Sequence, residues 1–390
     1  MTVPPTCDPP RPPPLAGVRV LDLSRLLPGP LCAQHLCELG ATVIKIEDPG
    51  AGDYARPAMR ELVNRGKIGL TLNLKCDEGR EIFFQLLANA DVVLEGFRPG
   101  VMQRLGLDYA ELSRRRPSLV YCAISGYGQS GARRHAAGHD INYLSRSGVL
   151  DMTGEGGGPP VIPGFLISDI LGGTLSAATG ILAALVEARQ TGRGRFIDVS
   201  MTDAVMAHNV LPLAEYNESG SVHARGTGSH TGGAARYRTY AARDGRFLAV
   251  GAQEKKFWDL LCDALELPEL KPLHSPDDAR APDVERLLRR AFATRDAADW
   301  LSVLEPLDCC VTAVRSFEEA LRDPDFRSRG TVRAPAADAP MSLGLPFVVS
   351  ELAPSAPKAA PRQGEHTDTV LGELGFGRDT IASLRSRGVI

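Results

Sequence analysis

The chain has 390 residues, of which 43% are hydrophobic and 23% charged, so it is long enough for two domains with apolar cores. Its formal net charge is only −3, which argues against a general nucleic-acid or polyanion binder. The eight cysteines form no CxxC pair and no metal-ligand spacing with histidine. Reduced thiols and no bound metal are therefore expected.

The first stretch, residues 1–14, contains seven prolines and no basic segment followed by an apolar one. This pattern predicts a disordered leader rather than a signal peptide. The longest apolar window, residues 170–186, is interrupted by glycine, serine and threonine, and is too short to cross a bilayer. We expect a cytoplasmic protein without a membrane partner.

Strands and helices alternate from residue 15 onward. Apolar residues 15–23 predict a strand, Pro28-Gly29-Pro30 opens a helix that ends at Leu39, and residues 41–46 predict the next strand. The pattern recurs with strands at 68–74, 91–95 and 119–125 and a helix at 77–90. It predicts an α/β large domain, residues 15–205, with a Rossmann-like parallel sheet. No Gly-x-Gly-x-x-Gly follows the first strand, which disfavours a nicotinamide cofactor.

The ends of these strands and the loops near them carry cationic and amide side chains. Loops at the carboxyl ends of parallel strands line the ligand crevice of an open sheet, and cations there suit phosphates. Any one such residue is also typical of a solvated surface. The residues are Lys45, Arg65, Asn73, Lys75, Arg98 and Arg104, with Gly96 beside them.

The segment 138–191 delivers a histidine and a carboxylate at the edges of two glycine-bearing turns. His139 follows Gly138, and Asp169 precedes an apolar helix that Gly192 ends. At the start of a helix, the macrodipole is expected to keep Asp169 ionised. The residues alone leave open whether Asp169 is only a helix cap and His139 only a packed histidine.

The remaining chain predicts a smaller domain between two linkers. After a linker at 206–233, a hairpin with an Asp244-Gly245 turn and helices at 255–265, 283–293 and 296–304 form an α+β domain, residues 234–330. A linker rich in alanine and proline occupies 331–361. The last segment, residues 362–390, is expected to return to the large domain.

The run Gly138-His139-Asp140-Ile141-Asn142-Tyr143, followed by Ser147-Gly148-Val149-Leu150, resembles the signature of the α-methylacyl-CoA racemases within the family III CoA-transferases. The resemblance extends from Leu15 to about Val389. It implies that His139 and Asp169 form a two-base pair that removes and returns the α-proton of an acyl-CoA thioester through an enolate.

The same resemblance implies a homodimer of two interlocked rings and no cofactor besides the CoA of the substrate. Glu254 then orients His139 from the partner subunit. Asp140 either binds substrate or orients the site, or it only caps the helix that starts at Ile141, and we expect the binding or orienting role. The residues expected to contact CoA are Lys45, Arg65, Leu72, Asn73, Lys75, Gly96, Arg98, Arg104 and Tyr127.

Two other functions stay open. In a CoA-transferase, the aspartate at position 169 attacks the thioester and forms an anhydride and then an aspartyl-CoA thioester. The motif around His139 favours the racemase over the transferase. Two other segments depart from the racemase pattern, namely Asp169-Ile170-Leu171-Gly172-Gly173 and Gly232-Gly233-Ala234-Ala235. A CoA-binding scaffold without catalysis is the third possibility, although both members of the catalytic pair are present.

Overall fold

The computed structural model describes residues 11–275, 280–336, 339–352 and 358–390. The chain forms two compact units. The first comprises the described residues up to Leu144, from Leu166 to Ala207 and from Arg322 to Ile390, and the second comprises Ser145–Phe165 and His208–Leu321.

The first unit contains a six-stranded sheet in the order β3-β2-β1-β4-β5-β6, with every neighbouring pair parallel. This confirms the predicted parallel α/β fold. The strands are β1 (Arg19–Asp22), β2 (Thr42–Glu47), β3 (Ile68–Thr71), β4 (Val92–Glu95), β5 (Val120–Ser125) and β6 (Phe196–Ser200). The strand order reverses between β1 and β4, and such a switch point opens a crevice at the carboxyl ends of the strands.

The strands of this sheet are apolar on both faces, because helices cover the sheet on each side. Leu21 and Tyr121 belong to one core with the helices of one layer, and Val20 and Cys122 to the core on the opposite face. The first layer contains α3 (Asp77–Leu87), α5 (Tyr109–Arg115), α16 (Thr367–Glu373) and α17 (Arg378–Ser386). The opposite layer contains α1 (Pro28–Glu38) and α8 (Ser176–Thr191).

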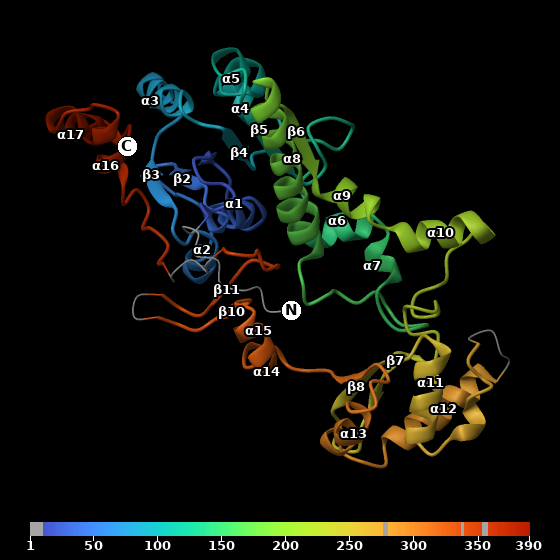
Figure 1. The fold of residues 1–390 in the computed structure, drawn as a ribbon. Coiled ribbons are helices and arrows are strands. Elements are labelled where there is room, and N and C mark those ends of the chain that lie inside the picture. The colour runs from blue at the N-terminus through green and yellow to red at the C-terminus, as the bar shows by residue number, and fades with distance from the viewer. Residues whose placement is uncertain (1–10, 276–279, 337–338, 353–357) are drawn as a thin grey trace. The chain divides into compact units, whose positions relative to one another are not determined.

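The C-terminal segment packs on the first unit. The backbone amide of Asn73 donates to the carbonyl of Val389 at 2.8 Å, and α16 lies beside β3 (Figure 1). Within the span predicted as a linker, β10 (Val332–Arg333) pairs antiparallel with β11 (Ser342–Leu343). Arg333 also forms an ion pair with Glu38 of α1, with 2.7 Å between its Nη2 and Oε2. That span is therefore partly docked on the first unit.

The helix that carries Asp169 differs from the prediction at its start. It begins as a π-helix, η1 (Ser168–Leu175), and continues as α8. Among the described residues, only the combined segment Ser168–Thr191 is long and apolar enough to cross a membrane; it has 24 residues and a mean hydropathy of 1.6. It is longer than the apolar window judged from sequence. Ala177, Ile181 and Leu185 pack into the core against the sheet.

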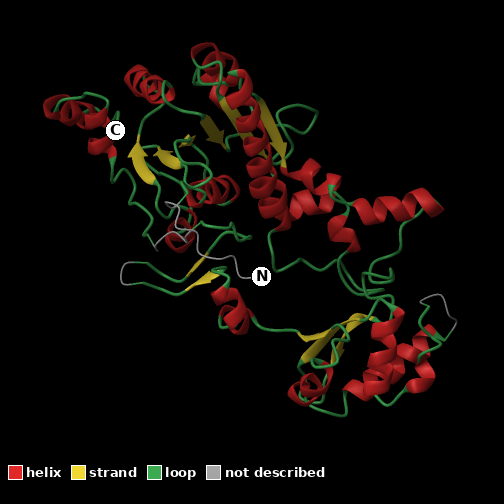
Figure 2. Cartoon of the chain, in the orientation of Figure 1, coloured by secondary structure: helices red, strands yellow, loops and turns green. Residues whose placement is uncertain are grey.

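The second unit has a three-stranded antiparallel sheet, β7 (Tyr237–Ala241), β8 (Phe247–Gly251) and β9 (Val311–Ala313), in the order β7-β8-β9. Figure 2 shows these strands with the helices of the same unit. The hairpin turn contains Gly245 at φ +80°, as the Asp-Gly pair predicts. The helices include α11 (Lys255–Ala264), α12 (Ala281–Phe292) and α13 (Ala297–Leu304).

The units differ from the sequence-based boundaries at two places: residues 322–330, expected in the small domain, belong to the first unit, and residues 145–165 also change sides. Residues 145–165, expected in the large domain, belong to the second unit, where Arg225 forms an ion pair with Asp151 at 2.7 Å. The pattern missed β6 and β9, and the predicted linker 206–233 contains the helix α10 (Val210–Ser219). The predicted leader falls outside the described residues except for positions 11–14.

Candidate active site

A cavity of about 300 Å³ lies at the carboxyl edge of the sheet, and we call it the central cavity. Its walls come from the loops that follow β1, β4 and β5, on both sides of the switch point. His139 and Asp169 both line it. Three further residues predicted from sequence also line it, namely Gly96, Arg98 and Tyr127. The structure therefore brings the predicted catalytic pair to one cavity.

Two residues of the Gly138–Tyr143 motif, Asn142 and Tyr143, hold the turn before His139 by hydrogen bonds. The Tyr143 hydroxyl donates to the carbonyl of Gly138 at 2.6 Å, and the His139 amide donates to the Asn142 side-chain oxygen at 3.0 Å. A Cβ on Gly138 would lie 2.7 Å from the Tyr143 ring and 2.8 Å from the Tyr127 hydroxyl. Glycine is therefore required for the close approach of these rings. The imidazole of His139 is exposed.

The side chain of Asp140 holds the backbone at Asp169 by hydrogen bonds. This side chain is buried, and its Oδ1 accepts hydrogen bonds from the amides of Ser168 at 2.7 Å and Asp169 at 3.0 Å. Instead of capping its own helix, α6 (Asp140–Arg146), Asp140 caps the start of η1. Between the two roles considered from sequence, this geometry favours orientation of the site over a substrate contact.

Burial, and then the nearby negative charge of Asp140, raise the pKa of the Asp169 carboxyl to about 6, while His139 opposes the rise. The shift is opposite to the one that a helix dipole alone predicts, because desolvation of the carboxylate outweighs the dipole. A carboxyl group with this pKa is still mostly ionised at pH 7. It can accept a proton near neutral pH, as a general base must.

A second cavity of about 300 Å³, the β3-side cavity, contains the predicted residues Leu72, Asn73 and Lys75. Arg25 lines both this cavity and the central one. Its guanidinium carbon lies 4.9 Å from the centre of the Tyr54 ring and 5.0 Å from that of Phe97. The same guanidinium also lies 3.7 Å from the Asp48 carboxylate, so its position between the two cavities is fixed by two aromatic rings and one ion pair.

A third cavity of about 560 Å³, the arginine cavity, is lined by Arg98, Arg104 and Arg134. Two carboxyl groups also line it. Burial raises the pKa of Glu95 to about 8, which keeps it largely neutral at pH 7, and Asp108 accepts a hydrogen bond from the amide of Glu111 as the cap of α5. The cavity is therefore positively charged and suited to an anion.

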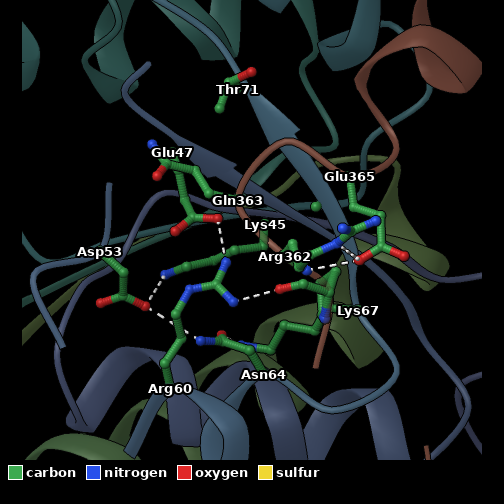
Figure 3. A network of polar contacts seen from close by, with 12 residues as sticks. Lys45, Glu47, Asp53, Arg60, Asn64, Lys67, Thr71, Arg362, Gln363 and Glu365 are labelled. Carbon is green, nitrogen blue, oxygen red and sulfur yellow. Dashed lines mark hydrogen bonds and ion pairs between the residues drawn. The ribbon is translucent and has the colours of Figure 1, made fainter. Parts of the chain in front are cut away.

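Lys45, predicted to contact CoA phosphates, has a different environment. Its side chain is completely buried, and its ammonium lies 3.2 Å from Asp53 (Figure 3). The same ammonium lies 4.0 Å from Asp22. The reason is register: Lys45 lies within β2, directly beside Asp22 of β1. A cation already neutralised inside the fold cannot reach a bound phosphate, so this assignment is corrected to a structural role.

Arg65 requires the same correction. Its side chain is 7% exposed, and its Nη2 lies 2.9 Å from both the Glu38 carboxylate and the carbonyl of Leu343. Arg65 therefore joins α1 to β11 and does not line any of the three cavities. Glu254 belongs to the second unit, where it is exposed at the start of α11 and makes no side-chain capping hydrogen bond.

Sequence reasoning missed Arg25 and Arg134. Arg25 follows β1 as Arg98 follows β4, so the rule that selected Arg98 could also have selected Arg25. Arg134 lies in the loop between β5 and α6, but not directly after the end of the strand as Arg25 and Arg98 do. No local pattern distinguishes it from Arg133 beside it.

Comparison with known proteins identifies a family and several relatives. The model of CoA-transferase family III matches residues 15–367. The α-methylacyl-CoA racemase of Homo sapiens is 38% identical over 385 residues, covering 96% of this chain and 97% of that protein. The succinyl-CoA:mesaconate CoA-transferase of Haloarcula marismortui is 32% identical over 390 residues, covering 94% of this chain and 98% of that protein.

Solved structures show the same fold. A CaiB/BaiF family protein from Brucella suis has a TM-score of 0.81 and 28% sequence identity, covering 93% of this chain and all of that chain. Rv3272 from Mycobacterium tuberculosis has a TM-score of 0.78 and 26% identity, covering 92% of this chain and 98% of that chain. These matches confirm the family that the motif around His139 indicated.

Proposed function

Since this chain belongs to CoA-transferase family III, we propose that it is an acyl-CoA racemase or epimerase acting on the α-carbon of a 2-methylacyl-CoA thioester. The observation that carries the proposal is that His139 and Asp169 line one cavity, with the pKa of Asp169 raised to about 6. The similarity to two mammalian α-methylacyl-CoA racemases, 38% and 36% identical, supports it.

In the proposed reaction, Asp169 or His139 removes the α-proton, depending on the enantiomer bound. The electron pair of the C–H bond moves into the thioester, whose oxygen becomes an enolate oxygen. The other residue then delivers a proton to the opposite face of the α-carbon, which completes the inversion. A carboxyl group whose pKa is raised to about 6 can both accept and return a proton near neutral pH, as inversion in the two directions requires.

The CoA moiety is proposed to extend from the central cavity over its two neighbours. Leu72, Asn73 and Lys75 line one neighbour, and Arg98 and Arg104 line the other. Gly96 and Tyr127 line the central cavity, where the thioester must lie to reach Asp169. The reaction needs no further cofactor, because an enolate forms by proton transfer alone.

We further propose that the active species is a homodimer of interlocked rings in which the partner subunit supplies Glu254 to orient His139. The exposed carboxylate of Glu254 has no capping hydrogen bond in its own helix, which leaves it available to such a contact. The test is analytical ultracentrifugation combined with activity. Activity in the monomer fraction would exclude the arrangement.

CoA transfer between carboxylic acids is the second candidate. The chain is 31–32% identical to several CoA-transferases, and the partly exposed Asp169 could attack a thioester as a nucleophile. In that reaction the thiolate of CoA leaves as an anhydride forms, and it then attacks the aspartyl carbonyl of the anhydride, which releases the donor carboxylate and gives an aspartyl-CoA thioester. The acceptor carboxylate then attacks this thioester, and the two steps run in reverse to give the new acyl-CoA and free Asp169.

Isotope exchange separates the two functions. A 2-methylacyl-CoA incubated with the enzyme in deuterated water should gain deuterium at the α-carbon without any acceptor acid. His139→Ala should abolish interconversion of the enantiomers, because one face of the carbon loses its proton donor. Transfer of CoA to an acceptor acid without α-deuterium, together with an Asp169 thioester trapped by hydroxylamine or borohydride, would overturn the racemase proposal.

A further inference from the structure

Arg134 occupies a position that the proposed function does not yet explain. It lines both the central cavity, where His139 and Asp169 lie, and the arginine cavity, where Arg104 lies. Arg98 is the other arginine with this double placement. A guanidinium at this boundary can contact a ligand that extends from one cavity into the other.

The charge of Arg134 is not neutralised by a carboxylate. No ion pair of Arg98, Arg104 or Arg134 is found among the residues that the structure describes, whereas Arg60, Arg65 and Arg333 each have a glutamate partner. The Nε of Arg134 donates to the Nε2 of His135 at 3.0 Å, so its terminal nitrogens stay available. Three such cations around one cavity repel each other, and a bound anion relieves that repulsion.

The backbone connects Arg134 to the catalytic histidine. Arg134 is five residues before His139, in a loop without helix or strand between Gly131 and Gly138. The His139 end of this loop is fastened by the Tyr143 hydroxyl on the Gly138 carbonyl. At the other end, Gly131 turns the chain at φ +81°. Between them, the described part of the chain gives this loop two short-range backbone hydrogen bonds, from the amide of Arg134 to the carbonyl of Gly131 and from the amide of Ala136 to the carbonyl of Arg133.

We propose that Arg134 binds a phosphate group of CoA and thereby holds the loop that positions His139. The ligand in this inference rests on the proposed function. A phosphate shared by Arg98 and Arg134 would join the loop after β4 to the loop before His139. Binding energy from a non-reacting part of the substrate would then serve the orientation of the reacting groups, which raises kcat rather than only lowering KM. Arg134 is thus a positioning residue.

The first test measures binding without chemistry. The binding of CoA and of adenosine 3′,5′-bisphosphate is measured by calorimetry. Arg134→Ala should weaken CoA binding about 10-fold or more, as expected for a lost charge-assisted contact. Arg134→Lys should recover part of the affinity. Arg133→Ala is the matched control, because Arg133 is an exposed neighbour that does not line the three cavities. Unchanged CoA affinity in Arg134→Ala would overturn the proposal.

The second test measures positioning. Rates of α-deuterium exchange are compared for an acyl-CoA and for the same acyl group on N-acetylcysteamine, which lacks phosphates. Arg134→Ala should lower kcat for the CoA thioester and leave the rate of the truncated thioester unchanged. Equal losses with both thioesters, or weaker CoA binding with an unchanged kcat, would refute the positioning role. If the unmodified enzyme shows no exchange, the proposed function fails, while calorimetry still decides whether Arg134 binds CoA.

Discussion

The carboxylate of Asp140 accepts a hydrogen bond from the backbone amide of Asp169, with 3.0 Å between the two atoms. Asp140 directly follows His139 in the chain, so this bond joins the segment of one catalytic residue to the backbone of the other. The same oxygen also accepts from the amide of Ser168 at 2.7 Å. Asp140 thus acts on Asp169 in two ways: it fixes the start of η1, and its negative charge raises the pKa of the Asp169 carboxyl.

Asp140→Asn separates these two effects. The amide oxygen can still accept both backbone hydrogen bonds, but the negative charge is gone. The pKa of Asp169 should therefore fall below about 6, yet stay above the ordinary 3.8, because burial is the larger cause. In the pH profile of kcat/KM for α-exchange, the acid limb should move to lower pH. Asp140→Ala, which also removes the acceptor, should lower kcat as well; an unmoved limb in Asp140→Asn would contradict the prediction.

Removing the charge of Lys45 should lower the stability of the protein, whereas removing the charge of Arg98 should weaken substrate binding. Lys45→Met leaves Asp22 and Asp53 buried with one cation fewer, which should lower the free energy of unfolding by about 3–5 kcal/mol. Arg98→Ala removes an exposed side chain and should leave stability almost unchanged while raising the KM for acyl-CoA. Urea denaturation and steady-state kinetics on both variants check this. Unchanged stability in Lys45→Met would show that the buried network does not need its charge.

The large-domain fold was readable from the sequence because parallel strands buried on both faces leave continuous apolar runs. Strand β5, predicted at residues 119–125, forms at Val120–Ser125, and the helix predicted at 28–39 forms at Pro28–Glu38. Strand β6 was missed because its first residue, Phe196, is 41% exposed and Arg195 precedes it. Such a short, half-exposed edge strand carries a weak periodic signal.

Only part of the candidate site could be predicted from the sequence. His139 and Asp169 were found because a motif places them, but whether a cation faces a cavity or a carboxylate is decided by tertiary contacts. Lys45 and Lys75 illustrate the difference. Lys45 of β2 lies beside Asp22 of the neighbouring strand β1, whereas Lys75 lines a cavity. The π-helical start of the Asp169 helix was not predicted either. A Cβ added to Gly172 would lie 2.6 Å from the backbone oxygen of Met201, so this part of η1 packs against a segment that is distant along the chain.

Glu95 should make the stability of the protein fall as pH rises. Burial raises the pKa of this carboxyl from 4.5 to about 8, so between these values the folded state keeps a proton that the unfolded state has released. Stability then decreases across this interval, by up to about 5 kcal/mol. Glu95→Gln cannot ionise and can still accept from the Phe97 amide, so it should lose this decline. Urea denaturation of both proteins at pH 5 and pH 8 measures it; identical pH dependence would disprove the assignment.

Gly138→Ala should damage catalysis more than binding. The added Cβ would lie 2.7 Å from the Tyr143 ring and 2.8 Å from the Tyr127 hydroxyl, so the ring or the turn must shift. Either shift disturbs the 2.6 Å hydrogen bond from Tyr143 to the Gly138 carbonyl, and with it the backbone that carries His139. A displacement of this kind can cost on the order of 100-fold in kcat.

The matched control is Gly372→Ala on α16, where an added Cβ meets nothing within 4 Å. This control should keep kcat unchanged and the stability equal or slightly higher, because alanine favours a helix over glycine. CoA affinity, measured by calorimetry, should stay within a few-fold in both variants, since Arg98 and Arg104 lie on another segment and the atoms nearest the added Cβ belong to Tyr143 and Tyr127 rather than to Arg134. A Gly138→Ala enzyme with full kcat would mean that the contact between Tyr143 and Gly138 does not position His139.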